Sequence, residues 1–272
     1  MSRVVALGPK GNEWSYDKDA RAYDLTRGAS PLAFTLRTTK GPTDTSITLA
    51  PSLSALVVVD MQNFFLHPSC SNHPTGLVAA ERTLELIKKC REVGIKIIWL
   101  NWGLNDGDLE NMPAATERSF NKSLVATPLD DRRTRVGFDS DLGEGRGRLL
   151  MEESWNAALY GALHDAASDS DTFCSKNRMS GFWHSETPLA KALVSGGFRS
   201  LLFAGVNTDR CVLGTLVDAY NRGYDCIMVE DCCATTTPGG QEVTIYNTAE
   251  IYGFVIDSKS VITGMLSTEA HI

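Results

Sequence analysis

Residues 201–223, "LLFAGVNTDRCVLGTLVDAYNRG", join two kinds of secondary structure across a short polar turn. The apolar run before Asn207 is typical of a strand buried on both faces, and the segment after Asp209 has apolar residues at helical spacing. Thr208 and Asp209 are both suited to cap the start of that helix. The stretch therefore predicts a strand, a turn and a helix, with Cys211 in the first helical turn.

The same alternation extends through the chain from residue 55 onward. Because repeated strand–helix–strand units form parallel sheets covered by helices, we expect an α/β protein with a three-layer, Rossmann-like fold. The predicted strands are 55–62, 95–102, 172–176, 200–206, 225–231 and 253–258, and the predicted helices are 76–93, 188–197, 209–222 and 238–250.

Two regions depart from this alternation. Residues 1–50 are polar and interrupted by glycine and proline, so we interpret them as an N-terminal extension that lies over the domain or reaches a neighbouring subunit. Residues 51–272 then form one domain. Within it, residues 103–170 are too long for an ordinary crossover, and we interpret them as an insertion that forms a lid or an interface.

Composition narrows the class of protein. A net charge of −7 over 272 residues, without a Lys/Arg cluster, argues against nucleic-acid binding. No apolar run is long enough for a membrane span or a signal peptide, so we expect a cytoplasmic protein without membrane contact. Seven irregularly spaced cysteines in a reducing compartment are expected to be thiols, and the lack of a CxxC pair argues against structural zinc.

Polar residues follow several predicted strands, at the edge where open parallel sheets bind ligands. Asp60 lies at the end of the apolar run of the first strand and is expected to have a raised pKa because it is partly desolvated. Lys176 ends the 172–176 strand, and Cys211 starts a helix, where the helix dipole and a nearby lysine would lower the thiol pKa. Taken singly, each has an ordinary structural interpretation: a loop cap, a solvated charge and a core residue.

Four segments together resemble the isochorismatase-like cysteine hydrolases: "ALVVVDMQNFF" (55–65), "SKNRMSGF" (175–182), "GVNTDRCV" (205–212) and "VEDCCA" (229–234). The resemblance implies a parallel sheet of about six strands and assembly into a homo-oligomer, a dimer or a tetramer. It also implies that Cys211 is the nucleophile, Asp60 the proton shuttle and Lys176 the electrostatic partner. A cis Val206–Asn207 peptide would direct the backbone N–H of Asn207, with that of Cys211, at the substrate oxygen.

One departure from the family concerns metals. Metal-dependent members have Asp-x-His after the second strand, where this chain has Asn101, Trp102 and Gly103. We therefore expect no metal and no other cofactor.

The reaction class follows from the same resemblance. The cysteine favours cleavage of the C–N bond of a small amide, ureide or carbamate through a thioester, and the pattern is most similar to the ureidoacrylate amidohydrolase branch. Two alternatives remain: an isochorismatase-type vinyl ether hydrolase, and a catalytically silent scaffold or interaction protein.

Substrate-binding residues are harder to predict than the three chemical groups. Aromatic side chains at strand ends serve as core residues at least as often as they line a pocket, and small polar ones often stabilise turns. No histidine lies in a recognisable Cys-His context, so none is expected to act as the base. The candidates for contact with substrate are Asn101, Trp102, Trp155, Ser180 and Trp183.

Overall fold

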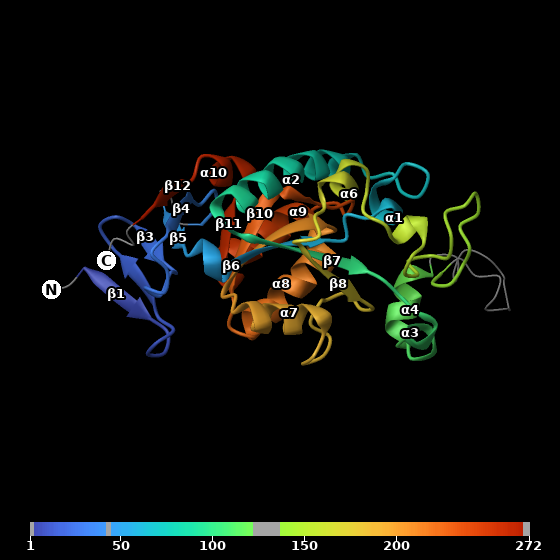
Figure 1. Ribbon diagram of the computed structural model, residues 1–272, viewed down its shortest axis with the longest axis horizontal. Helices are drawn as coiled ribbons and strands as arrows, with labels where there is room; N and C mark the ends of the chain where they lie inside the picture. Colours follow the sequence, from blue (N-terminus) through green and yellow to red (C-terminus); the bar gives the residue numbers. More distant parts are fainter. Residues whose placement is uncertain (1–2, 42–44, 122–136, 269–272) are drawn as a thin grey trace.

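A computed structural model describes residues 3–41, 45–121 and 137–268, and its centre is a sheet of six parallel strands (Figure 1). All five pairings in this sheet are parallel. The predicted α/β fold with a six-stranded parallel sheet is confirmed. In spatial order the strands are β11 (Phe254–Ile256), β10 (Asp225–Ala234), β9 (Ser200–Val206), β6 (Ser54–Val59), β7 (Lys96–Trp102) and β8 (Thr172–Lys176).

Helices cover both faces of the parallel sheet, which explains why β6 and β9 are buried along their whole length. One apolar cluster joins the sheet to α2 (Pro74–Val93), α6 (Ala162–Ala166) and α10 (Ser258–Ile262). The other joins it to α7 (Pro188–Gly196) and α8 (Leu213–Asn221). Two further segments, α9 (Gly240–Asn247) and a π-helix (Thr248–Tyr252), follow β10. The predicted helix 209–222 begins as a π-helix, Thr208–Val212, and only then becomes α8.

A second, mostly antiparallel sheet occupies one end of the molecule, at the left of Figure 1. The sequence did not predict its strands, which are only three to five residues long. Five of them come from the first fifty residues, and a C-terminal strand completes the sheet by pairing with β4. In spatial order they are β1 (Val4–Leu7), β2 (Trp14–Asp17), β3 (Ala22–Asp24), β5 (Ser46–Leu49), β4 (Ala33–Arg37) and β12 (Met265–Ser267).

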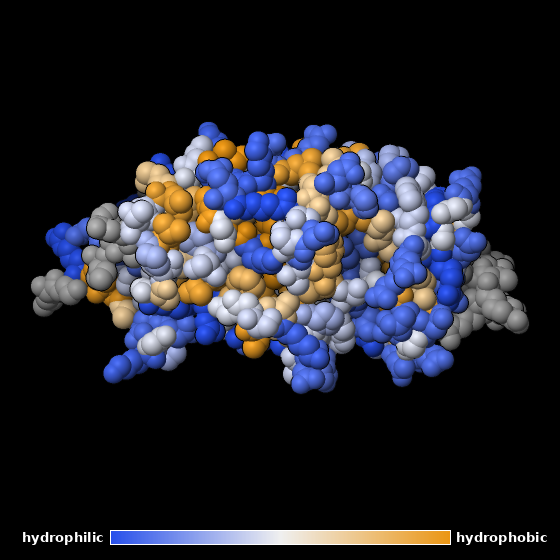
Figure 2. All heavy atoms as spheres, viewed as in Figure 1, coloured by the Kyte–Doolittle hydropathy of each residue, from blue (hydrophilic) through white to orange (hydrophobic). Residues whose placement is uncertain are grey.

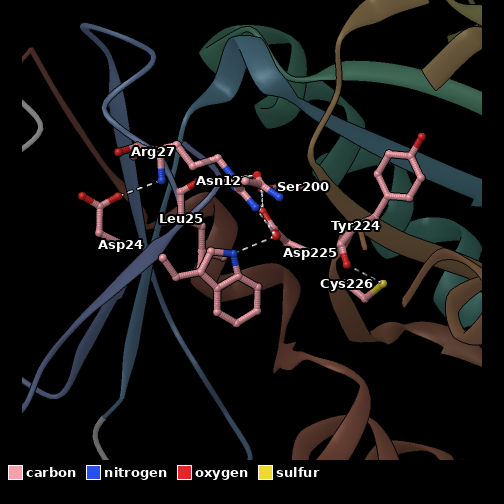
Figure 3. A network of polar contacts seen from close by, with 10 residues as sticks. Asn12, Asp24, Leu25, Arg27, Ser200, Tyr224, Asp225 and Cys226 are labelled. Atoms are coloured by element: carbon pink, nitrogen blue, oxygen red, sulfur yellow. Dashed lines mark hydrogen bonds and ion pairs between the residues drawn. The ribbon is translucent and has the colours of Figure 1, made fainter. Parts of the chain in front are cut away.

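A buried ion pair attaches this second sheet to the base of the parallel sheet (Figure 3). The Arg27 guanidinium donates two hydrogen bonds to Asp225, at 2.7 and 2.8 Å, where β10 begins. Ser200 Oγ and Trp14 Nε1 donate the other two bonds to the same carboxylate. Because both oxygens of this buried carboxylate are fully paired, the site is a structural junction.

The insertion after β7 folds around the opposite end of the parallel sheet, at the right of Figure 1. Its described part contains α3 (Asp106–Glu110), α4 (Ala114–Phe120) and a 3-10 turn, Trp155–Ala157, next to α1 (Asn63–Leu66). Residues 122–136 of the predicted insertion lie outside the described residues. The rings of Phe120 and Phe138 pack against Trp102, at centroid distances of 4.9 and 5.5 Å. The insertion therefore covers the carboxyl end of β7.

The hydropathy of the surface varies along the molecule. On the face shown in Figure 2, hydrophilic residues predominate toward the two ends and hydrophobic residues gather over the middle. None of the helices in the described ranges combines the length and the apolar character needed to cross a bilayer.

Candidate active site

Asp60 lies directly after β6, at the centre of the parallel sheet, and is completely buried. Its φ of 52° is in the left-handed region, which aspartate tolerates better than most residues. The backbone N–H of Asp60 donates to Leu100 O at 2.9 Å, and Oδ1 accepts from the Trp102 N–H at 3.2 Å. Burial raises the pKa of this carboxyl group, against the opposing effect of Lys176, as the sequence predicted.

Lys176 ends β8 and is only 1% exposed, so its charge requires buried partners. Its Nζ lies 2.9 Å from Asp60 Oδ2, and it donates to Arg178 O at 3.2 Å. The same ammonium group lies 4.0 Å from the ring centroid of Trp102, which faces it from the neighbouring strand. The strand ends thus bring Asp60 and Lys176 into direct contact.

Cys211 lies in the π-helical turn after β9, and the peptide between Val206 and Asn207 is cis, as predicted. Its Sγ is 3.2 Å from Met179 Sδ, in the loop after β8. Asp60, Lys176 and Trp102 are all close enough to shift the pKa of the thiol. Asp60, Lys176 and Cys211, the first and last of which are 151 positions apart in sequence, therefore meet at one point.

The predicted lowering of the thiol pKa is wrong for this structure. Cys211 is 4% exposed, and burial, followed by the nearby charge of Asp60, raises its pKa to about 12. Lys176 acts in the opposite direction and is outweighed. The sequence argument considered the helix start and the lysine but not the burial, and the ion pair with Asp60 already engages the lysine. The raised pKa of Cys211 therefore favours a neutral thiol.

Gly205 allows the turn that carries Cys211 to approach the centre of the sheet. Its φ is +133°, and a β-carbon at this position would lie 2.1 Å from Val59 O in the adjacent strand. No other residue type fits that space. The glycine thus lets β9 pair with β6 up to Gly205 and Val59, close to Asn207 and Asp60.

The five candidate contact residues differ in where they lie. Trp102 is beside the buried cluster, and its side-chain N–H lies close enough to the Cys211 thiol to lower the pKa of that thiol. Asn101 Oδ1 is buried and has no hydrogen-bond partner among the described residues. Ser180 Oγ accepts from the Phe182 N–H at 3.0 Å, which is a turn role, and Trp183 is half-buried in the same loop. Trp155 is 38% exposed and packs edge-on against His67. For these five, contact with substrate stays a prediction.

Sequence reasoning missed two residues that shape the site. Met179 covers the thiol, and only the structure places it there. Gln62 is fully buried and bridges three backbone groups: it donates to Trp102 O and Ala157 O, and its Oε1 accepts from the Trp102 N–H. A glutamine two residues after a strand-end aspartate is the sequence signal that points to this position.

Position 103 is where metal-dependent members of the family have histidine. A β-carbon on Gly103 would lie 2.9 Å from Ser175 Oγ and 3.1 Å from Glu152 Cγ, so a larger side chain has no room without shifts. Across the three described ranges, no three His, Cys, Asp or Glu side chains are grouped so that they could hold a metal ion. The residues present do not fit the metal site of those relatives.

Comparison with known proteins agrees with this geometry. The family model "Isochorismatase domain" matches residues 54–260. Ureidoacrylate amidohydrolase RutB of Klebsiella pneumoniae (strain 342) is 31% identical over 222 residues, covering 79% of this chain and 88% of that protein. RutB of Agrobacterium fabrum is 31% identical over 216 residues, covering 77% and 88%.

Two solved structures have the same fold. A cysteine hydrolase from Pseudomonas syringae pv. phaseolicola gives a TM-score of 0.63 at 18% identity, covering 83% of this chain and 95% of that one. N-carbamoylsarcosine amidase from Thermoplasma acidophilum gives 0.55 at 24% identity, covering 75% and 96%. With a family model that spans the parallel sheet and the Asp60, Lys176 and Cys211 cluster, the chain belongs to the isochorismatase family of hydrolases.

Proposed function

We propose that this protein is a cysteine-dependent amidohydrolase that cleaves the C–N bond of a small ureide, carbamate or amide. The observation that carries the proposal is the buried contact among Asp60, Lys176 and Cys211. The relatives named ureidoacrylate amidohydrolase and N-carbamoylsarcosine amidase support this substrate class. Assembly into dimers or tetramers stays a prediction.

The cluster can transfer a proton without changing its net charge. At rest it contains a carboxylate, an ammonium and a neutral thiol, which sum to zero. Movement of the thiol proton to Asp60 gives a carboxylic acid, an ammonium and a thiolate, which also sum to zero. Since isolated charges are costly in a buried site, this conservation makes the transfer feasible although the pKa of the thiol alone is raised.

The reaction then proceeds in two halves. Asp60 accepts the thiol proton as Cys211 Sγ attacks the carbonyl carbon, and the oxyanion accepts hydrogen bonds from the N–H groups of Asn207 and Cys211. The C–N bond breaks, and Asp60 gives its proton to the departing nitrogen. Asp60 next accepts a proton from a water molecule that attacks the thioester, and the thiol leaves with that proton restored.

Two polar side chains at the end of β7 support a ureido substrate. Buried polar groups almost always have partners, yet Asn101 Oδ1 has none among the described residues, and the Trp102 N–H has only the Cys211 thiol, a weak acceptor, within reach. A ureido group offers both a carbonyl acceptor and N–H donors. We infer that these two side chains hydrogen-bond the substrate.

A product screen tests the proposed function directly. Incubation with N-carbamoyl amines, ureido acids, carbamates and primary amides should release ammonia, with a ureido compound hydrolysed fastest. Isochorismate serves as the comparison, because a vinyl ether hydrolase would release pyruvate instead. Pyruvate without ammonia would exclude the amidohydrolase assignment, and the lack of either product would favour the silent scaffold.

Chelators should leave ammonia release unchanged, because Asn101 and Gly103 replace the ligands that metal-dependent relatives use. The measurement is activity after incubation with EDTA and gel filtration, with and without added zinc. A loss in EDTA that zinc restores would contradict the metal-free mechanism.

The pH dependence should follow Asp60, which must be ionised to accept the thiol proton. Burial raises the pKa of Asp60, so kcat/KM should fall with decreasing pH already above the ordinary aspartate value of about 3.9. Lys176→Met removes a charge that lowers this pKa, and should move the acidic limb to higher pH. The control is Lys191→Met, on the surface of α7. Coincident limbs in wild type and Lys176→Met would show that the ion pair does not tune the base.

A further inference from the structure

Residues 207–210, which lead from the cis peptide to Cys211, form a segment that we call the nucleophile turn. Each of its four side chains is held by a different neighbour. Side-chain contacts of this kind fix the backbone of the turn. The proposed mechanism depends on that backbone, because the N–H groups of Asn207 and Cys211 bind the oxyanion. The four contacts are Asn207 Oδ1 with His73 Nε2 at 2.9 Å, Thr208 Oγ1 with Gln241 Oε1 at 2.5 Å, Thr235 Oγ1 with Asp209 Oδ1 at 2.5 Å, and Arg210 Nη2 with Thr237 Oγ1 at 3.0 Å.

His73 is the anchor nearest to the cis peptide, and its hydrogen bonds define its tautomer. It is 3% exposed and precedes α2 as the N-cap residue. Its Nδ1 accepts from the Gly76 N–H at 2.9 Å. A backbone N–H can only donate, so Nδ1 carries no proton and the neutral ring is protonated on Nε2. That Nε2–H donates to Asn207 Oδ1.

The surroundings keep the ring neutral and in place. Burial lowers the pKa of His73, Arg210 lowers it further, and the bond to Asn207 opposes both. Protonation of Nδ1 would also place its N–H against the backbone N–H of Gly76, so that two donors would face each other. The fit is tight, because a β-carbon on Gly76 would lie 2.7 Å from His73 Nδ1. The ring therefore holds one orientation.

We propose that His73 is a positioning residue for the proposed amidohydrolase reaction, which holds Asn207 so that the Asn207 N–H meets the substrate oxyanion. The inference rests on the proposed function. His73 acts through Asn207 and does not touch the substrate. Helix capping alone does not require this residue, because Asn, Asp or Ser would cap α2 as well or better. What the imidazole adds is a second nitrogen that reaches Asn207, 134 residues away in sequence.

Two substitutions separate these roles. His73→Asn keeps an acceptor at the Nδ1 position, and so the cap, but has no donor that reaches Asn207. His73→Gln keeps an amide donor near the Nε2 position but loses the cap. We expect His73→Asn to lower kcat about 10-fold or more with KM close to wild type, as for other residues that orient a reacting group. We expect His73→Gln to recover most of kcat and to lower Tm by about 2–4 °C.

Asp257→Ala is the control for the loss of a cap, because Asp257 caps α10 by accepting from the Ser260 N–H and lies outside the nucleophile turn. It should lower Tm to a similar extent and leave kcat unchanged. Asn207→Ala provides a second route: it should reduce kcat like His73→Asn, with no further loss when the two are combined. Equal kcat in His73→Asn and His73→Gln, or additive losses in the double variant, would overturn the positioning role.

The controls for the proposed function are run first, on wild type and Cys211→Ala. If wild type releases no ammonia, or Cys211→Ala is still active, the proposed function fails and the His73 role fails with it. If those controls hold and the two His73 variants do not differ, only the role of His73 is wrong.

Discussion

Cys211→Ala should lower kcat for ammonia release by at least about 10⁴-fold, because no thioester can form without the sulfur. Hydrogen bonds from the turn and the binding of substrate would account for any residual rate. The substitution removes one atom from a packed site, so the fold should remain. The measurement is steady-state ammonia release by the purified variant, with circular dichroism to verify folding.

Cys174→Ala is the matched control for this prediction. Cys174 is 3% exposed, belongs to the same apolar cluster as Cys211 and precedes Lys176 by two residues. Its substitution creates a similar small cavity without touching the nucleophile. It should therefore keep kcat near wild type. If Cys211→Ala retained more than a few per cent of the wild-type rate, covalent catalysis through this thiol would be excluded.

Arg27→Met should reduce the free energy of unfolding by about 3–5 kcal/mol, the usual cost of removing one partner from a buried ion pair. The side chains of Arg27 and Asp225 are 8% and 1% exposed, so the remaining carboxylate would be left buried with only Ser200 and Trp14 as donors. In a protein of this size the loss corresponds to a decrease in Tm of about 10 °C. Urea titration followed by circular dichroism measures it.

Arg3→Met is the control, because Arg3 pairs with Asp19 on the surface of the same sheet and exposed ion pairs contribute little. Its unfolding curve should overlay that of wild type. Arg27→Met combined with Asp225→Leu should recover part of the lost stability, since the unpaired buried charge is then absent. Equal curves for Arg27→Met and Arg3→Met would show that the junction does not stabilise the protein.

The sequence predicted the parallel sheet well because its signal is local. A run such as 200–206 is apolar throughout, and the segment after it has helical spacing, so each unit can be identified without its partners. Asp60, Lys176 and Cys211 could be placed together for the same reason: strand ends of a parallel sheet share one edge.

What the sequence did not predict is either very short or depends on contacts between distant residues. The strands of the second sheet are three to five residues long, and β4 is completed by β12, more than 220 residues later. The high thiol pKa of Cys211 requires knowledge of its burial, and the role of His73 requires knowledge of Asn207. For Trp155 the structure gives 38% exposure and an edge-on contact with His67, and its contact with substrate stays a prediction.

The ion pair between the second sheet and β10 has a consequence for protein synthesis. A ribosome releases residue 27 long before residue 225, and β4 even longer before the strand that flanks it. Contacts between such distant residues form late and slowly. The five N-terminal strands can pair with one another early, but the outer edge of β4 stays unpaired until β12 has emerged, which leaves that edge open to aggregation and to chaperone binding during synthesis.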